Sequence, residues 1–270
     1  MKKVLTIAGS DSTGGAGLQA DLKTFEEYGV FGFSSITSVV TMDPEQGWSH
    51  EVTDLGVELL RKQLVSVFAG EGIDALKTGM MASEDNIELA SQFIKEYDIE
   101  KAVIDPVIAC KGTAQILQPK SVEGLKKFLI PNAYVTTPNL IEAGILSGLG
   151  DITSVEGMKE AAKIISDLGA KNVVVKGGHR LGIDKALDVF YDGQDFFELE
   201  NELYKTDFNH GAGCTFAAAI TAGVAKDLSP LEAAKLAKDF VAAGIKNGVR
   251  INKYVGHVWH GAYNKAEDRL

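Results

Sequence analysis

Short apolar runs alternate with amphipathic stretches from one end of the 270-residue sequence to the other. The first apolar run is Val4–Ala8, and the stretch that follows it places Leu18, Leu22 and Phe25 at helical spacing. Parallel strands need long crossover connections, usually helices, whereas antiparallel strands can be joined by short turns. A regular alternation of strand and helix therefore predicts an α/β fold with a central, mostly parallel sheet flanked by helices on both faces.

The alternation continues along the whole chain. Further strands are expected near residues 33–40, 74–77, 102–105, 134–136 and 172–176, and further helices near 57–67 and after residues 83, 153 and 229. Two of these helix starts carry capping boxes, Thr153–Glu156 and Ser229–Glu232. The segment Ala186–Leu199 instead holds two strand-like runs around Asp192 and Gly193, which predicts a small added β-hairpin. No linker or repeat interrupts the pattern, so residues 1–270 are expected to form a single domain.

Charge and composition narrow the class of protein. The net charge of -10 disfavours nucleic acid as a partner, because phosphate backbones repel an acidic surface. No apolar stretch approaches the roughly 18 residues needed to cross a bilayer, and the first apolar run ends at Gly9, too early for a secretory signal. The two cysteines, Cys110 and Cys214, give neither a disulfide framework nor a zinc pattern. We therefore expect a cytoplasmic protein with no nucleic-acid or membrane partner.

The strongest local motif is a glycine-rich turn, NHGAGCTF, at residues 209–216. Gly211 and Gly213, with Ala212 between them, let backbone N–H groups point together where a helix begins, which predicts an anion site. Such a site can stabilise the charge on a phosphoryl group in transfer. Cys214 would lie in the first helical turn, where a thiol pKa tends to fall, so a thiolate could act as base or nucleophile. The alternative is an ordinary glycine turn before a tightly packed helix with a buried cysteine.

A second glycine-rich segment, IAGSDSTGGAG at residues 7–17, follows the first predicted strand. Its glycines do not have the spacing of a dinucleotide fingerprint, and it lacks the lysine ending of a P-loop. A loop that lets a flat ligand lie against the backbone is the better functional interpretation. Asp11 and Asp21 could reach polar atoms of that ligand, although Asp21 could equally be a solvated helix residue.

Charged residues also gather at predicted strand ends. Asp105 ends one strand and Glu142 lies just inside a helix, and two carboxylates are enough to hold a phosphate-bound Mg²⁺. Glu142 could instead be an acid favoured at a helix N-terminus. Lys176, ahead of two glycines, suits a phosphate tail, unless it extends to water. The histidines show no metal-ligand spacing; His210 either contacts a ligand or packs within the glycine turn, and His50 is a possible ligand contact.

Taken together, the segments IAGSDSTGGAGLQADLKTF, VIDPV, TPNLIEA, VVVKGGH and NHGAGCTFAAAI resemble, in this order, the hydroxymethylpyrimidine/pyridoxal kinase branch of the ribokinase superfamily. The resemblance runs from Val4 to about Asn247. It implies a ribokinase-like fold, a homodimer, ATP and Mg²⁺ as cofactors, and a heterocyclic alcohol as substrate.

The resemblance also implies a function for each matching residue. Gly211, Ala212 and Gly213 would form the anion hole, and Cys214 would stand where most of the superfamily has an aspartate base. The magnesium–phosphate region would be served by Asp105 and Glu142. The residues expected at ATP are Asn139, Lys176, Gly178, His210 and Gly213. The residues expected around the heterocycle are Gly9, Asp11, Asp21, Met42, His50, Met80, Val107 and Cys110.

Two of these residues bear on the choice of substrate. Pyrimidine kinases of the family usually have a glutamine where this chain has Met42, and a buried ring amine left without a partner costs about 1–3 kcal/mol. Cys110 lies in a segment that resembles the family's lid, and its thiol could add reversibly to the aldehyde of pyridoxal. We therefore expect phosphorylation of pyridoxal, pyridoxine or pyridoxamine, giving pyridoxal 5′-phosphate from pyridoxal in vitamin B6 salvage.

Three alternatives stay open from the sequence. The first is a hydroxymethylpyrimidine/phosphomethylpyrimidine kinase of thiamine synthesis, or an enzyme with both activities. The second is a protein that binds or stores pyridoxal phosphate on a kinase scaffold without turnover. The third, a nicotinamide-dependent oxidoreductase, is disfavoured by the glycine spacing.

Overall fold

The computed structural model describes residues 1–108, 119–178 and 180–265. In this part of the chain nine strands form one sheet, in the order β3-β2-β1-β4-β5-β6-β7-β8-β9. The bounds are β1 Lys3–Asp11, β2 Phe31–Asp43, β3 Ser49–Asp54, β4 Ala75–Thr78, β5 Ala102–Ile104, β6 Val135–Thr136, β7 Val173–Lys176, β8 Lys185–Tyr191 and β9 Phe196–Glu202. Strands β2, β1, β4, β5, β6 and β7 pair in parallel, and β3, β8 and β9 pair antiparallel with their neighbours. The prediction of a mostly parallel sheet is confirmed.

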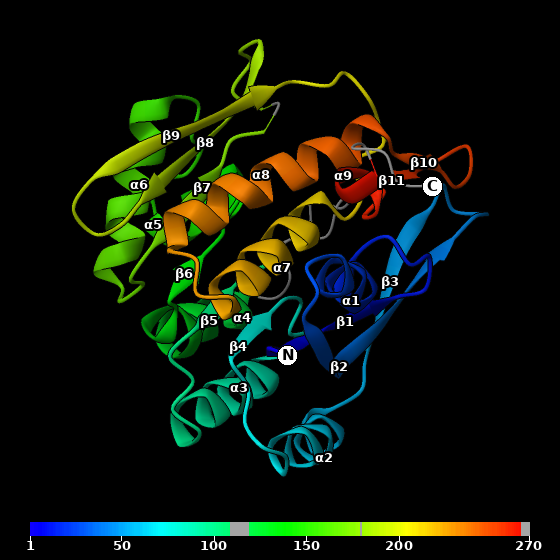
Figure 1. The fold of residues 1–270 in the computed structure, drawn as a ribbon, viewed down its shortest axis with the longest axis vertical. Helices are drawn as coiled ribbons and strands as arrows, with labels where there is room; N and C mark the ends of the chain where they lie inside the picture. The colour runs from blue at the N-terminus through cyan, green and yellow to red at the C-terminus, as the bar shows by residue number, and fades with distance from the viewer. Residues whose placement is uncertain (109–118, 179, 266–270) are drawn as a thin grey trace.

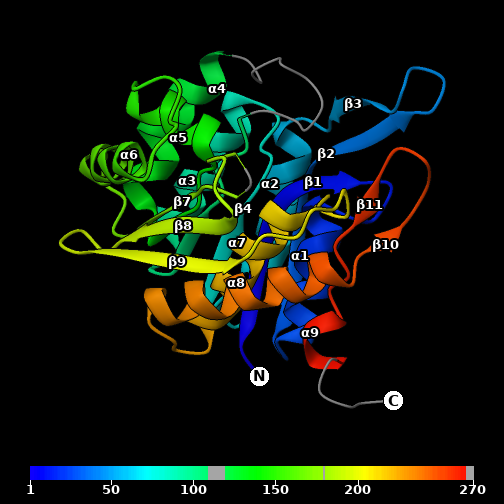
Figure 2. The same cartoon turned by 90° about the horizontal axis from the view of Figure 1, so that it is seen from above.

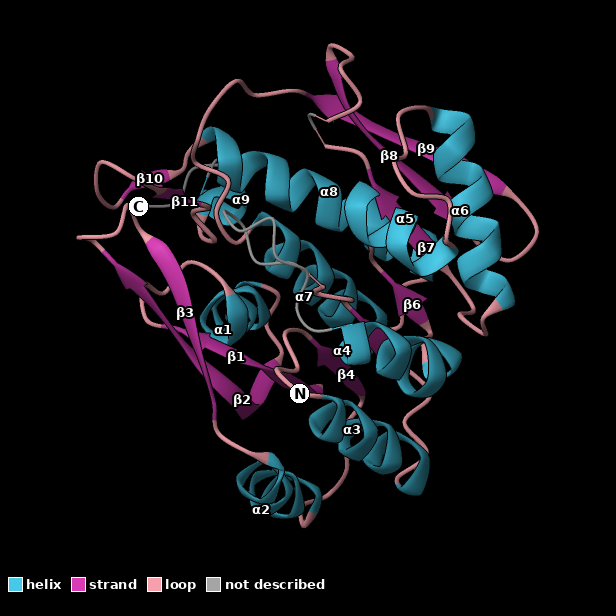
Figure 3. Cartoon of the chain, turned by 180° about the vertical axis from the view of Figure 1, so that it is seen from behind, coloured by secondary structure: helices cyan, strands magenta, loops and turns pink. Residues whose placement is uncertain are grey.

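Helices cover both faces of this sheet, as predicted. One face carries α1 (Gly17–Glu27), α7 (Ala212–Ala225) and α8 (Pro230–Lys246), seen in front in Figure 1. The other face, in front in Figure 3, carries α2 (Val57–Phe68), α3 (Glu84–Glu96), α5 (Leu140–Ser147) and α6 (Val155–Asp167). The short α4 (Pro119–Gly124) continues through a π-helical turn (Leu125–Leu129) and a 3₁₀ turn (Ile130–Asn132), and α9 (Ala262–Lys265) follows near the C-terminus. Figure 2 shows the two helical layers above and below the sheet.

The central strands are apolar on both sides, because each side faces a helical layer. Val4, Ala75 and Val103 point towards α7, whereas Leu5 and Leu76, the next residues along their strands, point into the opposite core. This alternation follows from the two-residue period of a strand. Helix α7 is buried throughout from Thr215 to Ala225, and its alanines and glycines let it lie close against the sheet.

Local helix signals were mostly, but not entirely, predicted correctly. Ser229 and Glu232 form the expected capping box of α8, and the side chain of Ser83 accepts a hydrogen bond from the first turn of α3. The box predicted at Thr153–Glu156 is wrong by one residue: Ser154 is the N-cap of α6 and accepts from the backbone N–H of Gly157. Ser154 itself has an extended backbone, with φ -139° and ψ 161°, so the helix begins at Val155 and Thr153 lies before it.

Two antiparallel hairpins flank the parallel strands. The predicted hairpin at Ala186–Leu199 is confirmed as β8 and β9. The hairpin of β2 and β3 was not predicted; it projects past the sheet beside β10 (Val249–Arg250) and β11 (Gly256–His257) in Figure 2. Trp48 of its turn stacks on Tyr254 of the β10–β11 turn, with ring centroids 5.4 Å apart. Within the described ranges, none of the helices combines the length and apolarity that crossing a bilayer requires.

Candidate active site

A cavity of about 760 Å³ opens at the carboxyl ends of the parallel strands. The strand order turns back between β1 and β4, and ligands of open α/β sheets bind beside such a reversal. Among the described residues, the cavity is lined by all of the predicted site residues except Asp21: Gly9, Asp11, Met42, His50, Met80, Asp105, Val107, Asn139, Glu142, Lys176, Gly178, His210, Gly211, Ala212, Gly213 and Cys214. Segments spread over the chain therefore meet in one place. Cys110 lies outside the described residues, so its predicted contact with substrate stays a prediction.

The cavity has two ends that differ in their chemistry. At one end the β2–β3 hairpin supplies Met42 and His50, which pair across the two strands, and Met80 lies close to Gly9. At the other end the segment after β9 supplies Tyr204, and α8 supplies Ile245. The glycine turn 209–214 and the strand ends lie between them, and Lys176 reaches to 3.5 Å from the position that a side chain on Gly213 would occupy. The geometry suits two ligands that meet in the middle.

Two helix N-termini converge on this middle region. Helix α7 begins at Ala212 after Gly211, whose φ of 84° few other residues adopt. A methyl group on Gly211 would overlap the carbonyl oxygen of Gly15, so the two glycine-rich loops pack backbone against backbone. Helix α1 begins at Gly17, which also lines the cavity. Backbone N–H groups and the positive ends of two helix dipoles thus face one site, as an anion requires.

Cys214 lies in the first turn of α7, half-buried, with part of its surface on the cavity. Burial raises the pKa of its thiol to about 11, although the Lys77 ammonium opposes this increase. The carboxylates of Asp21 and Asp105 raise it further, and the N–H of Gly17 lowers it. The prediction of a lowered pKa is therefore wrong: removal from water and the two carboxylates outweigh the Lys77 ammonium and the N–H of Gly17, and the resting thiol is protonated at neutral pH.

Asp11 holds the first glycine-rich loop and His210 in place. Its Oδ1 accepts from the N–H (2.8 Å) and hydroxyl (2.7 Å) of Thr13, and its Oδ2 accepts from the N–H of Ala16 at 2.9 Å. Oδ2 also lies 2.8 Å from Nε2 of His210. Burial acts to raise the pKa of Asp11, but the bonds from His210 and Thr13 hold it far below its usual range. Asp11 therefore faces the cavity as a fixed carboxylate that already has several partners.

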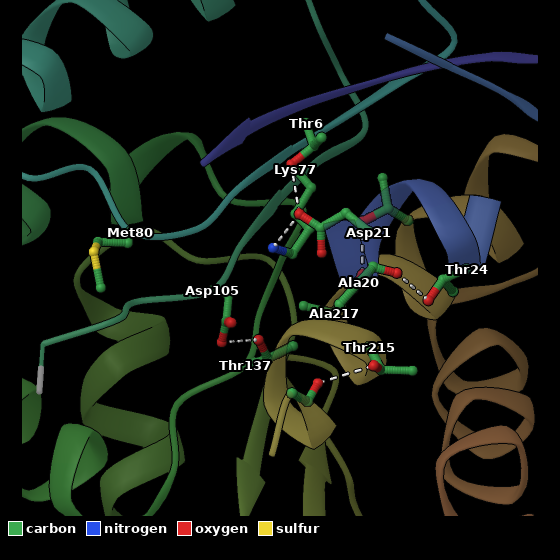
Figure 4. Close-up of polar contacts among 12 residues, drawn as sticks. Thr6, Ala20, Asp21, Thr24, Lys77, Met80, Asp105, Thr137, Thr215 and Ala217 are labelled. Atoms are coloured by element: carbon green, nitrogen blue, oxygen red, sulfur yellow. Dashed lines mark hydrogen bonds and ion pairs between the residues drawn. The ribbon is translucent and has the colours of Figure 1, made fainter. Parts of the chain in front are cut away.

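A second polar network lies where β5, β6 and β7 end. Asp105 Oδ1 accepts from Lys176 Nζ at 3.1 Å and from the hydroxyl of Thr137 at 3.0 Å, the latter drawn in Figure 4. Asn139 and Glu142 form a capping box at the start of α5, with the N–H of Asn139 donating to Glu142 Oε2 at 2.8 Å. Glu142 is therefore a helix-capping acid that also lines the cavity, and its predicted contact with Mg²⁺ stays a prediction.

These residues fit a metal ion that arrives with phosphate. The described part of the chain contains no group of three or more His, Cys, Asp or Glu side chains placed to hold a metal by themselves. Asp105 and Glu142 both line the cavity, and each acts on the other through its charge. Mg²⁺ usually takes one or two carboxylates and completes its shell with phosphate oxygens and water. The pair would hold such a Mg²⁺, whose charge would relieve their repulsion.

Glu142 should make stability depend on pH. Burial raises its pKa from 4.5 to about 7, with Lys176 opposing and Asp105 adding to the increase. Between these values the folded chain keeps a proton that the unfolded chain has lost, so this group lowers the free energy of unfolding as pH rises, by up to about 3 kcal/mol. We expect Glu142→Gln to remove this part of the slope. Urea denaturation gives the free energy of unfolding at about pH 5 and about pH 8. If this free energy changed equally between the two pH values in the wild type and the variant, the assignment would be contradicted.

Asp21 does not reach the cavity, so its predicted contact with the substrate is corrected. Its side chain is fully buried, where Oδ2 accepts from the hydroxyl of Thr6 at 2.6 Å and from Nζ of Lys77 at 3.0 Å (Figure 4). Lys77, which the sequence analysis missed, lines the cavity instead. Its signal was a lysine inside an otherwise buried strand, ALKT, because lysines are almost never fully buried unless paired.

A buried ion pair beneath β8 was also missed. Lys238 of α8 donates to Asp188 Oδ2 at 2.6 Å, and Asp188 Oδ1 accepts from the N–H of Gly177 at 3.0 Å. Both side chains line the cavity. The pair ties α8 to β8 and to the loop after β7, which fixes the second end of the cavity. Neither residue has a local sequence signal, since they lie far apart in the chain.

Comparisons with known proteins agree with this geometry. A family model described as phosphomethylpyrimidine kinase matches residues 11–259. The chain is 49% identical over 262 residues to a pyridoxine kinase of Bacillus subtilis, covering 97% of each protein. It is 42% identical over 263 residues to a hydroxymethylpyrimidine/phosphomethylpyrimidine kinase of the same organism, covering 97% of this chain and 96% of the other. A solved structure of the pyridoxal kinase from Staphylococcus aureus in complex with AMP-PCP and pyridoxal is 49% identical, with a TM-score of 0.93, covering 98% of this chain and 95% of that one.

Proposed function

Since this chain belongs to the phosphomethylpyrimidine kinase family, of ribokinase-like fold, we propose that it is a pyridoxal kinase. It transfers the γ-phosphate of ATP to the 5′-hydroxymethyl group of pyridoxal, and of pyridoxine or pyridoxamine. With pyridoxal the product is pyridoxal 5′-phosphate, which places the enzyme in vitamin B6 salvage. The observation that carries the proposal is the anion site formed by the N-termini of α1 and α7, between the two chemically different ends of the cavity.

The nucleotide fits the end built from β8, β9 and α8. ATP with Mg²⁺ is the phosphoryl donor, consistent with the AMP-PCP bound in the Staphylococcus aureus enzyme. Lys176 would meet the phosphates beside Gly213, and Asp105 and Glu142 would hold Mg²⁺, which neutralises developing negative charge. The N–H groups of the 211–213 turn would receive the oxygens of the transferring phosphoryl group.

The vitamin fits the end beneath the β2–β3 hairpin. Gly9, Met42, Met80 and Val107 offer mainly apolar surface there, which suits a flat heteroaromatic ring. The thioether of Met42 is a poor acceptor for the exocyclic amine of hydroxymethylpyrimidine. This residue and the higher identity to the pyridoxine kinase favour a pyridoxal-type substrate over the pyrimidine.

The raised pKa of Cys214 favours a relay over a standing thiolate base. As the alcohol oxygen bonds to the γ-phosphorus, the bond from that phosphorus to the oxygen of ADP breaks. The alcohol proton passes to the sulfur while the thiol gives its own proton to an oxygen of the transferred phosphate, from which it escapes to solvent. A loose transition state needs little activation of the attacking alcohol, so a weakly acidic thiol is sufficient.

A panel of alcohols tests the proposal. With ATP and Mg²⁺ present, we expect pyridoxal to be phosphorylated with a kcat/KM at least about tenfold above that of hydroxymethylpyrimidine, because only the latter leaves an amine without a partner. Product masses and steady-state rates are the measurements. A preference for the pyrimidine would favour the thiamine kinase, to which the chain is also similar. Ligand binding without turnover would favour a storage protein. Sedimentation of the same sample tests the homodimer, which stays a prediction.

A further inference from the structure

A buried ion pair lies behind the anion site, and the reaction described above does not use it. Lys77 Nζ and Asp21 Oδ2 are 3.0 Å apart, and both side chains are 0% exposed. Thr6 donates its hydroxyl to the same oxygen at 2.6 Å. Figure 4 shows the three side chains joined between β1, β4 and α1, with Asp105 close to Lys77. Two charges removed from water at this depth are costly unless something compensates them.

The pair has a direction. Lys77 lines the cavity, whereas Asp21, on α1, does not reach it. Because Ala75 points to the α7 side of the sheet, Lys77, two residues later on β4, points there as well. The ammonium therefore lies on the cavity side of the pair, and the carboxylate lies behind it, away from the cavity. The positive end of the pair adds to the helix N-termini that converge on the same site.

The pair is incompletely satisfied, which argues against a purely structural function. Asp21 Oδ1 is buried, and no hydrogen-bond partner for it exists among the described residues. Among those residues, Asp21 supplies the one side-chain hydrogen bond that Lys77 makes. An apolar pair of similar shape is often equally stable or more stable than a buried ion pair. A costly charge beside a reacting group indicates a function for that charge.

We propose that Lys77 and Asp21 form a charge-positioning pair: the Lys77 ammonium stabilises negative charge at the Cys214 sulfur, when the thiol ionises or while its protons are in transit during the relay, and on the moving phosphoryl group, and Asp21 holds that ammonium in place. Lys77 acts through these groups and is a positioning residue. The phosphoryl half of this statement rests on the proposed function, and the sulfur half does not. Charge stabilisation by a preorganised group costs no rearrangement during the reaction.

The charges around the thiol agree with this arrangement. Burial opposes the charged form of Lys77, yet Asp21, Cys214 and Asp105 together raise its pKa, so it stays an ammonium. Towards Cys214, Lys77 from β4 favours the thiolate, and Asp21 from α1 and Asp105 after β5 oppose it. Lys176 from β7 also interacts with Cys214 through its charge. Lys77 is the largest favourable charge, and its effect exceeds that of Asp21.

Alkylation of the thiol in the ligand-free protein tests the proposal. The main variant is the double substitution Asp21→Asn with Lys77→Met, which removes both charges with little change in volume; Lys77→Met alone would strand a buried carboxylate. Iodoacetamide labelling at about pH 8, resolved by peptide mass, reports Cys214 separately from Cys110. We expect labelling of Cys214 to slow by about threefold or more, because the loss of the Lys77 ammonium outweighs the loss of the Asp21 carboxylate and a tenfold change corresponds to one unit of thiol pKa. The kcat should fall about 100-fold with little change in the KM for ATP.

The matched control is the ion pair at the other end of α7. Lys101 donates to Asp227 at 2.7 Å and to the carbonyl of Val224, far from the cavity. Lys101→Met with Asp227→Asn should leave the labelling rate of Cys214 unchanged, although it removes the same two kinds of charge. An equal slowing in this control would mean that labelling reports general loosening of α7, and it would overturn the proposal.

The remaining outcomes also decide the matter. If the Asp21→Asn/Lys77→Met variant folds and its Cys214 is alkylated at the wild-type rate, the proposal is overturned, even if the wild type is an active kinase. A double variant that does not fold would overturn it too, because the pair would then be a requirement of the α1–β4 contact. An inactive wild type with the expected slowing would count against the proposed kinase and not against the effect of Lys77 on the thiol.

Discussion

Replacing Cys214 by alanine should lower kcat by about 10²–10⁴-fold, the range for losing a group that handles a proton in the transition state. Alanine is the best helix former, and the chain already carries several alanines in α7, so the helix should persist. On the first turn of α7, the sulfur is the proton-carrying side-chain group that lines the cavity, whereas the hydroxyl of Thr215 is buried. The KM for ATP should change little, because the nucleotide end of the cavity lies apart from the thiol.

Steady-state kinetics with pyridoxal, together with thermal unfolding of the same preparation, measure this effect. Cys214→Ser is the matched variant: its hydroxyl can also relay a proton, so its kcat should lie between those of the wild type and the alanine variant. If the alanine variant turned over within about twofold of the wild type, Cys214 would have no part in the proton transfer. The anion site would then carry the reaction by itself.

Replacing Gly211 by alanine should lower kcat/KM by about 10²–10³-fold, the cost of losing preorganised donors to a transferring group. The added methyl would overlap the carbonyl oxygen of Gly15, and the φ of 84° is unfavourable for alanine. The chain can relieve the overlap only by moving the 209–214 turn away from the first glycine-rich loop. That movement would separate the N-terminus of α7 from that of α1.

Gly148→Ala is the matched control for this prediction. Gly148 ends α5 with a φ of 78°, and a methyl group there would meet nothing within 4 Å. It therefore carries the same backbone strain, about 1 kcal/mol, without the overlap. We expect a small decrease in thermal stability and wild-type kinetics. Equal losses of activity in both variants would mean that strain, not the contact of the two loops, explains the Gly211 result.

Local patterns predicted the frame of the molecule well, because its strands are apolar on both sides and its helices carry clear caps. The β8–β9 hairpin followed from Asp192 and Gly193, and the start of α8 followed from Ser229 and Glu232. The start of α6 was off by one residue because Thr153 and Ser154 are adjacent and both able to cap, so local spacing does not choose between them. The β2–β3 hairpin was missed because β3 is mostly exposed and has no apolar run to mark it.

The sequence predicted most of the residues that line the cavity, but it did not predict their charge interactions or the thiol pKa. The glycine-rich segments and strand-end charges sufficed to gather the lining residues, because strand ends of a parallel sheet share one edge. Whether Asp21 faced the ligand or a buried lysine depended on the rotation of α1, which sequence spacing alone did not give. The thiol pKa of Cys214 was mispredicted for a related reason: the helix position is local, whereas burial and the charges of Asp21, Asp105 and Lys77 come from distant parts of the chain.

The contact of Gly15 with Gly211 has a consequence for biosynthesis. These residues lie 196 positions apart in the sequence (211 − 15), and the anion site exists only where their loops meet. A nascent chain still lacking its last quarter could pair its early strands, since synthesis proceeds from the N-terminus, but it would have no α7 to complete the site. Bringing such distant segments together is among the slower events of folding. Kinase activity measured during translation would therefore come from chains that already contain α7, and shorter partly folded chains would contribute none.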